Sequence, residues 1–306
     1  MRSRHSVGLL LAMLGAIAFS GKAIIVKLSY RYGVDAVTVI MYRMLFALPM
    51  FIAVAWWASK RNHAQDNPLT RRDVLAIMGL GFLGYYLASY LDFIGLQYIT
   101  ASLERLILYL NPTLVMLLGA LLYKHPLHAK RVWAMAISYC GVLVVFAHEV
   151  NFAGPGVVIG SAFVFASAIS YALYLMFSGQ LVQRIGAMRL VGLASCVACV
   201  LAIAQFMVLR PLSSMLVPAE VVSLALLNAT VCTVMPVLLI MLAIERIGAA
   251  LTAQTGMVGP MSTVLLGVWV LGEPLNAWIG VGTVLVLGGV YLASQQGEKN
   301  GLRHSG

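Results

Sequence analysis

The chain has 306 residues and a formal net charge of +10, yet only 10% of its residues are charged and 61% are hydrophobic. An ordinary soluble domain has about 25% charged residues, so this composition excludes a soluble fold with a hydrated surface. Apolar runs of about 18 residues or more recur along the chain, and this length crosses about 30 Å of hydrocarbon. The basic residues lie in short loops rather than in one patch, so we expect no nucleic acid as a partner.

The apolar runs predict an all-α polytopic membrane protein with ten transmembrane helices. In chain order these are 7–29, 35–57, 73–91, 98–122, 131–148, 156–177, 189–209, 220–243, 249–271 and 276–294. The breaks between them contain turn and charge signals, such as Arg31-Tyr32-Gly33 and the stretch 151–156. Each segment is apolar on all sides, as a lipid-embedded helix should be. One membrane domain therefore accounts for the whole length.

The distribution of Lys and Arg predicts the orientation, because cytoplasmic loops carry an excess of both. With the amino terminus inside, the cytoplasmic segments hold Arg2, Arg4, Lys60, Arg61, Arg71, Arg72, Lys124, Lys130, Arg131, Arg184, Arg189, Arg246, Lys299 and Arg303. The outer loops hold Arg31 and Arg210. We expect a multi-pass protein of the plasma membrane, the inner membrane of a bacterium, with both termini cytoplasmic.

An internal duplication is the strongest signal in the sequence. A shift of 148 positions, without a gap, places Pro112 on Pro260 and Gly141 on Gly289, with Leu-Leu-Gly at 117–119 on the same three letters at 265–267. The repeats are 1–148 and 149–306. Each contains five predicted helices, an odd number, so the two copies enter the membrane in opposite senses. This inverted architecture is typical of secondary transporters. The basic loop 124–131 aligns with 272–279, which has no Lys or Arg, as the inversion requires.

These repeats carry motifs that resemble the EamA-type family of the drug/metabolite transporter superfamily. The second copy has Ala249, Pro260, then Leu-Gly-Glu-Pro-Leu at 271–275 and Gly-Val at 289–290; the first helix ends on Lys27. The first copy departs from the family pattern with Lys-His at 124–125 where Gly-Glu is usual. Phe-Ser at 19–20 stands where Trp-Gly is common. The resemblance implies a transporter; members of the family export amino acids, nucleosides, drugs and other metabolites, and some import.

Four charged residues stand out among those within the predicted helices: Lys22, Arg43, Glu104 and Arg105. A charge in the membrane costs at least a few kcal/mol unless it is paired or hydrated, so such residues mark candidate sites. Lys22, Arg43 and Glu104 lie about 9–12 Å from the outer ends of their helices at 1.5 Å per residue. We expect one cluster that binds substrate or a proton. The alternatives are a static ion-pair lock, or cations that reach the outer headgroups.

Asn111-Pro112 and Gly259-Pro260 break two helices at repeat-related points. Proline frees a backbone carbonyl, which is tolerated against protein or a hydrated cavity. Paired breaks of this kind indicate a substrate site at the midplane of the membrane. A kink that serves packing is the alternative.

Two further pairs are weaker candidates for substrate contact. Thr252 and Thr255 begin a polar stripe on the helix 249–271. Tyr86 and Tyr90 share a face of the helix 73–91 and could stack on a substrate, although aromatic residues near helix ends often anchor the protein at the membrane interface.

We therefore expect a secondary active transporter that exports a small amino-acid-like or amphipathic metabolite by alternating access. Its partners would be the substrate and the bilayer, with a proton as the candidate coupling ion. The sequence contains no G-x-x-x-x-G-K-[ST], H-E-x-x-H or G-x-S-x-G motif, so we expect no ATP coupling within the chain and no enzyme. The spacing His125-x-x-His128 is only a weak match to a metal-binding motif, and we expect no metal and no cofactor. A non-transporting or lipid-translocating protein is the alternative, and an intramembrane enzyme a weaker one.

Overall fold

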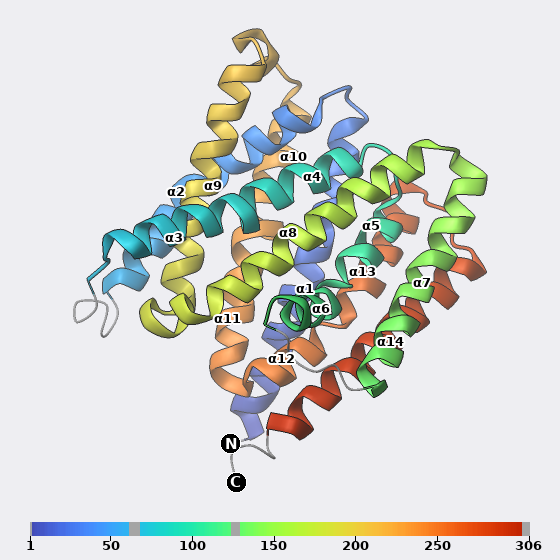
Figure 1. The fold of residues 1–306 in the computed structure, drawn as a ribbon. Helices are drawn as coiled ribbons and strands as arrows, with labels where there is room; N and C mark the ends of the chain where they lie inside the picture. The colour runs from blue at the N-terminus through green and yellow to red at the C-terminus, as the bar shows by residue number, and fades with distance from the viewer. Residues whose placement is uncertain (1, 61–67, 124–128, 302–306) are drawn as a thin grey trace.

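The computed structural model describes residues 2–60, 68–123 and 129–301, and over these ranges it contains helices and no strand. The helices form one bundle in which α1 begins and α14 ends at the same end (Figure 1). The elements of the first half are α1 (Arg2–Tyr30), α2 (Ala36–Lys60), α3 (Arg71–Gly81), η1 (Phe82–Leu87), α4 (Ala88–Gly95), α5 (Ala101–Leu108), α6 (Asn111–Tyr123) and α7 (Ala129–Ala153). Those of the second half are α8 (Gly156–Ile185), α9 (Ala187–Leu209), η2 (Leu212–Met215), α10 (Ala219–Ala229), η3 (Thr230–Val234), α11 (Met235–Ile247), α12 (Ala249–Thr255), α13 (Val258–Leu266), η4 (Gly267–Leu271) and α14 (Ala277–Gly301).

Eight helical runs in the described part of the chain are long and apolar enough to cross a membrane. Two shorter apolar helices, Val258–Leu271 and Ala277–Leu292, complete the bundle. Each of the ten predicted segments is mostly helical, although 98–100, 109–110 and 256–257 within them are not. The polytopic all-helical fold is confirmed, while the count of ten crossings stays a prediction. The predicted helix 156–177 is too short, because α8 continues through polar residues to Ile185. A helix can continue in this way where its end leaves the hydrocarbon.

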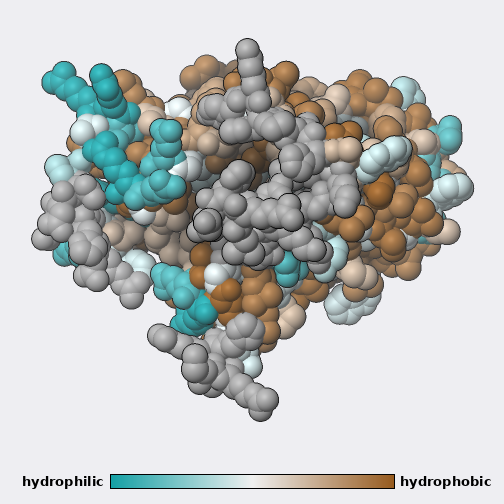
Figure 2. Space-filling model, turned by 60° about the horizontal axis from the view of Figure 1, so that its bottom comes forward, coloured by the Kyte–Doolittle hydropathy of each residue, from teal (hydrophilic) through white to brown (hydrophobic). Residues whose placement is uncertain are grey.

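The surface of the bundle is largely apolar. Large hydrophobic side chains such as Leu265, Trp269 and Val284 are mostly exposed. In the space-filling view hydrophobic residues cover broad areas, and the hydrophilic residues gather in a few patches (Figure 2). A soluble protein rarely exposes so wide an apolar surface, and lipid is the solvent that suits it.

Local sequence signals explain several helix boundaries. Thr70 and Asp73 form a capping box at the start of α3, in which the Thr70 side chain accepts from the Asp73 amide and the Asp73 carboxylate accepts from the Thr70 amide. Gly186 separates α8 from α9 with φ +86°, and Gly248 separates α11 from α12 with φ +79°. A side chain is strained at such φ values, so glycine allows these very short connections.

Irregular turns interrupt four of the helical runs at repeat-related points. The π-helical turns η1 and η3 begin at Phe82 and Thr230, which are 148 positions apart. The break between α5 and α6, at 109–110, has its counterpart at 256–257, between α12 and α13. Both kinds of irregularity therefore recur at closely corresponding positions of the two sequence copies.

The two halves pack against each other in reciprocal pairs. α2 lies along α9, and α7 lies along α14 at one edge of the bundle (Figure 1). α1 packs on α11, and α4 packs on α8. The shift of 148 positions relates α1 to α8 and α4 to α11, so the second contact is the first with the halves exchanged. The most extensive helix–helix contacts of the bundle therefore lie between the two halves and not within either of them.

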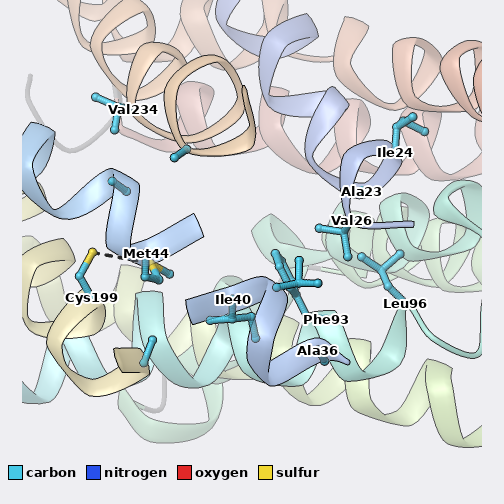
Figure 3. Packing of buried hydrophobic residues seen from close by; sticks show 14 of the residues in the cluster. Ala23, Ile24, Val26, Ala36, Ile40, Met44, Phe93, Leu96, Cys199 and Val234 are labelled. Carbon is cyan, nitrogen blue, oxygen red and sulfur yellow. Dashed lines mark hydrogen bonds between the residues drawn. The ribbon is translucent and has the colours of Figure 1, made fainter. Parts of the chain in front are cut away.

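The main hydrophobic core lies where α1, α2, α4 and α9 meet. Ala23, Val26, Ile40 and Phe93 are among its buried residues (Figure 3). The Cys199 thiol faces the Met44 sulfur at 3.7 Å in the same cluster. Cys199 is a free cysteine, so it acts here as a small apolar residue of the core.

Candidate functional site

A cavity of about 720 Å³ lies in the interior of the bundle. Its wall includes Phe19 and Lys22 of α1, Arg43, Met44 and Phe51 of α2, Gly84, Tyr85, Ala88, Ser89 and Asp92 of η1–α4, and Arg105, Leu108, Tyr109, Asn111 and Pro112 of α5–α6. The second half contributes Ser167 and Tyr171 of α8, Ser195 and Ala198 of α9, Thr233 and Val237 of η3–α11, Gln254, Met257 and Val290. The wall is mainly apolar, with a few charged groups, which is the usual make-up of a small-molecule site.

Lys22 is the centre of a buried ion cluster. Its ammonium donates a hydrogen bond to the Asp92 carboxylate at 2.6 Å, and it lies 3.1 Å from the nearer oxygen of Glu104. All three side chains are at least nine-tenths buried. The structure thus brings Lys22 and Glu104 together, as the sequence predicts. One ammonium serves two carboxylates, so either carboxylate could take up a proton while Lys22 keeps the other as its partner.

Asp92 is the residue of this cluster that the sequence analysis missed. The predicted third helix ends at residue 91, so Asp92 counted as part of a loop, whereas the helix continues through α4 to Gly95. A signal was available, because Asp92 stands within the apolar stretch 90–94. A carboxylate in such a stretch is costly unless it is paired or hydrated, so Asp92 marks a candidate site for the same reason as Glu104.

Arg43 does not pair with Glu104 but points to the second half. Its Nε donates to the Thr233 hydroxyl at 3.1 Å, and its guanidinium lies over the Phe93 ring at 5.1 Å. Thr233 in turn donates to the Asn228 carbonyl at 2.8 Å, inside the helix that contains η3. The π-turn therefore holds Arg43 in position. The Nη1 atom of Arg43 is buried and has no hydrogen-bond partner among the described residues.

Arg105 lies in α5, which packs on α13 of the second half. Its guanidinium lies over the Phe19 ring at 5.1 Å. A Cβ on Gly259 would approach the Arg105 Nη2 atom to 2.8 Å, so glycine at this break leaves room for the guanidinium. Ser20 of α1 donates to the Gly259 carbonyl at 2.7 Å. Within the described chain the buried Nε of Arg105 has no partner.

The predicted helix breaks lie where the sequence places them, and one of them reaches the cavity. Asn111 and Pro112 form the first turn of α6 and line the wall. Pro260 stands in the first turn of α13 and is buried. In both cases the missing N–H falls in the first turn of a helix, where it would have no intrahelical partner.

Tyr86 and Tyr90 are not among the residues that line the cavity. Their rings stack on each other at 6.4 Å, packed against the hydrophobic core. Tyr85 lines the cavity instead, and its hydroxyl lies 3.0 Å from that of Tyr174. Tyr85 stands in the π-turn, which adds a residue to the helix and rotates the following faces relative to a regular helix. A regular helical projection could not predict which tyrosine faces inward.

Thr252 and Thr255 also lie outside the lining. Their hydroxyls donate to the carbonyls of Gly248 and Leu251 in their own helix, at 2.7 and 2.8 Å. Gln254 and Met257 provide this part of the wall. Hydroxyls that bond to the carbonyl four residues before them are satisfied locally, which explains a polar stripe without a ligand.

A second polar cluster, outside the cavity lining, connects the halves at the start of α5. The Glu273 carboxylate accepts from the Ala101 amide at 2.7 Å and from the Ser102 hydroxyl at 2.9 Å. The Glu149 carboxylate accepts from the Thr100 hydroxyl. Lys27, the family-type lysine of α1, donates to the Ile99 carbonyl at 2.6 Å. These bonds attach α1, α7 and the connection before α14 to one helix end.

In the described part of the chain, no group of three or more His, Cys, Asp or Glu side chains is placed so that it could hold a metal ion. The pair His125 and His128 lies outside the described residues.

Comparisons with known proteins show the family and the fold of the chain. The model of the EamA-like transporter family matches residues 6–147 and again residues 158–295. The uncharacterized transporter YcbK of Bacillus subtilis (strain 168) is 28% identical over 295 residues, which cover 94% of this chain and 91% of that protein. An uncharacterized transporter of Archaeoglobus fulgidus is 20% identical over 93% of this chain and 96% of its own length. A solved crystal structure, 17% identical, covers 96% of this chain with a TM-score of 0.64 and shows the same fold. The family matches extend over well more than half of the sequence, and the chain belongs to the EamA-like transporter family.

Proposed function

We propose that this chain is a secondary active transporter that exports a small metabolite, amino-acid-like or amphipathic, across the plasma membrane by alternating access. The observation that carries the proposal is the cavity of about 720 Å³, whose wall comes from both halves and includes Lys22, Arg43, Asp92 and Arg105. Buried charges in a chain of this apolarity are costly, and they are typical of a substrate or ion pathway. A membrane transporter binds its substrate in such a space within the bilayer.

Alternating access requires places where the helices can bend around the site. The π-turns at 82 and 230 and the breaks at 109–110 and 256–257 supply such places, and they touch the cavity through Gly84, Thr233 and Asn111. Two separate family matches, at 6–147 and 158–295, support two repeats of five helices. In opposite orientation, one repeat would open the cavity to the outside by the motion with which the other opens it to the cytoplasm.

A proton is the proposed coupling ion, and Asp92 with Glu104 is its proposed site. Two carboxylates that share one ammonium cannot both be fully neutralised by it. Protonation of one carboxylate would remove the remaining negative charge. Both Glu104 oxygens are buried and receive no hydrogen bond within the described ranges, although Lys22 is close. A proton on Glu104 would make it a donor and weaken its attraction to Lys22.

Transport in proteoliposomes tests the proposal. The purified chain would be reconstituted with an imposed pH gradient and screened with labelled amino acids and amphipathic metabolites. We expect uptake or efflux of at least one compound that depends on the gradient. The variant Glu104→Gln keeps the shape of the side chain and should lose the dependence on the gradient. Glu220→Gln, at an exposed carboxylate in the first turn of α10, is the matched control. If the wild-type protein moves no metabolite but scrambles labelled phospholipid, metabolite export is refuted and lipid translocation is the function.

A further inference from the structure

The charges around the cavity do not balance. In the described part of the chain the cavity wall and its ion cluster contain three cations, Lys22, Arg43 and Arg105, and two carboxylates, Asp92 and Glu104. With every group ionised, one positive charge remains without a partner. Lys22 with its two carboxylates carries a net charge of −1, and the two arginines, which form no ion pair within 4 Å among the described residues, carry +2. A buried cation without an anion is unfavourable, and a ligand of opposite charge removes that cost.

The two guanidinium groups also have unused hydrogen-bond donors. Arg43 and Arg105 are more than nine-tenths buried, and both border the cavity. Nη1 of Arg43 and Nε of Arg105 receive no partner from any described residue. Each arginine is held from one side, Arg43 by Thr233 and the Phe93 ring, Arg105 by the Phe19 ring. Contact with one ring face leaves the edge of the guanidinium, which carries the N–H groups, free to bind an anion.

The rest of the wall suits an apolar body. Met44, Phe51, Leu108, Val237 and Met257 line the same space. Burial against these side chains favours an organic molecule that carries its charge at one end over a small, strongly hydrated ion.

We infer that the substrate is an organic anion, with a carboxylate that Arg43 and Arg105 bind and an apolar body that the rest of the cavity encloses. The inference rests on the proposed function and narrows its substrate class. Arginine binds a carboxylate through two parallel N–H···O bonds, so the two guanidinium groups would distinguish a carboxylate from an amide of the same shape. The residues that recognise the anion are distinct from the Lys22–Asp92–Glu104 cluster, which keeps its internal pairing when the anion binds.

A binding experiment on the full chain, purified in detergent, tests this without any transport step. The probes are phenylacetate, 4-phenylbutyrate and octanoate, each compared with its primary amide and with the amine of the same chain. Isothermal titration and thermal shift would be measured for the wild type, Arg43→Gln, Arg105→Gln and Arg246→Gln. Arg246 is an exposed arginine that donates to the Leu242 carbonyl of its own helix, and it serves as the matched control.

We expect at least one carboxylate to bind about tenfold more tightly than its amide and amine, the ratio that a charge-assisted hydrogen bond supports. Arg43→Gln and Arg105→Gln should each remove that advantage, whereas Arg246→Gln should keep it. The inference is overturned if no carboxylate of the panel exceeds its amide, or if both cavity variants bind the carboxylates as the wild type does.

Two further measurements distinguish an organic-anion site from a lipid-headgroup site and from the proposed transport function. Phosphatidylglycerol, added in place of the probes, should stabilise the wild type and the Arg43→Gln variant equally. A lipid effect that depends on Arg43, without any carboxylate effect, would assign the anion site to a headgroup phosphate and overturn the inference. Carboxylate binding without transport in proteoliposomes would refute the proposed function and leave the anion site standing. Transport of cationic compounds alone would refute the anion site and leave the proposed transport function standing.

Discussion

Ser138 of α7 donates a 3.4 Å hydrogen bond to the carbonyl of Val286 in α14, and these two residues are separated by the same 148 positions that relate the two copies of the sequence. Around this bond the helices cross at glycine. A Cβ on Gly141 would lie 2.8 Å from the Gly282 carbonyl oxygen, and one on Gly289 would lie 2.6 Å from the Ala134 carbonyl oxygen. The second contact is the first one with the helices exchanged. Repeat-related residues therefore lie on opposite sides of one crossing, and this close approach joins the two halves.

The crossing predicts opposite effects for two adjacent glycines of α14. Gly289→Ala should destabilise the protein by about 1–3 kcal/mol, because its methyl group would meet the backbone of α7. Gly288→Ala should be neutral, or stabilising by up to about 1 kcal/mol, since alanine favours the helix. A Cβ on Gly288 meets no described atom within 4 Å beyond its own helix. Thermal unfolding of both variants in detergent measures the difference, and equal midpoints would contradict the crossing.

The ion cluster predicts that its two carboxylates substitute for each other. Asp92→Asn or Glu104→Gln alone leaves Lys22 one anionic partner, so the purified protein should remain folded. The double variant strands the ammonium and should lose about 3–5 kcal/mol, more than the sum of the single effects. Adding Lys22→Gln to the double variant should recover most of the loss. Strictly additive thermal shifts would show that the carboxylates do not share Lys22.

The Glu273 carboxylate accepts hydrogen bonds from the Ala101 and Ser102 amides, so it should slow hydrogen exchange in the first turn of α5. Glu273→Gln keeps one acceptor oxygen and removes the negative charge that favours a helix amino terminus. We expect hydrogen exchange at the amides of Ala101 and Ser102 to accelerate about tenfold, the ratio for a lost charge-assisted bond. Exchange in the α10 segment should not change. Unaltered exchange at both amides would mean that the carboxylate does not hold this helix end.

A surface ion pair outside the membrane-spanning segments predicts a pH effect. The Arg210 guanidinium contacts the Asp35 carboxylate at 2.8 Å. Burial alone would raise the pKa of Asp35, but hydrogen bonds from Arg210 and Thr38 outweigh it and hold that pKa below its ordinary value. The pair therefore stabilises the fold above the unfolded-state value of about 3.9, and the contribution is lost as the pH falls through the lower folded-state value.

Because both side chains of this pair are more than one-third exposed, Asp35→Asn should cost about 0.2–1 kcal/mol at pH 7. The melting curves of the wild type and the variant should converge toward pH 3. A difference that persists at pH 3 would assign the effect to helix capping by Asp35 rather than to its charge.

The orientation of the chain predicts the outcome of reporter fusions. A reporter after Gly306 should be cytoplasmic, and one inserted within 151–156 should be external, because the basic loops remain inside. The two ends of the described bundle lie on the same side, which is consistent with an even number of crossings (Figure 1). An external carboxyl-terminal reporter would contradict ten crossings.

The sequence by itself determined where the helices lie, the duplication and the family. A membrane helix must satisfy its backbone bonds internally, so span length and apolarity are local properties that can be read directly. The breaks at Pro112 and Pro260 were also visible, because proline acts on its own helix. The tertiary structure decided which charges meet. Lys22 pairs with Asp92 across 70 positions, and Arg43 bonds to Thr233 across 190. No local pattern contains such pairings, because they depend on how helices from the two halves pack. The same holds for Tyr85, which a π-turn brings to the cavity while Tyr86 packs in the core.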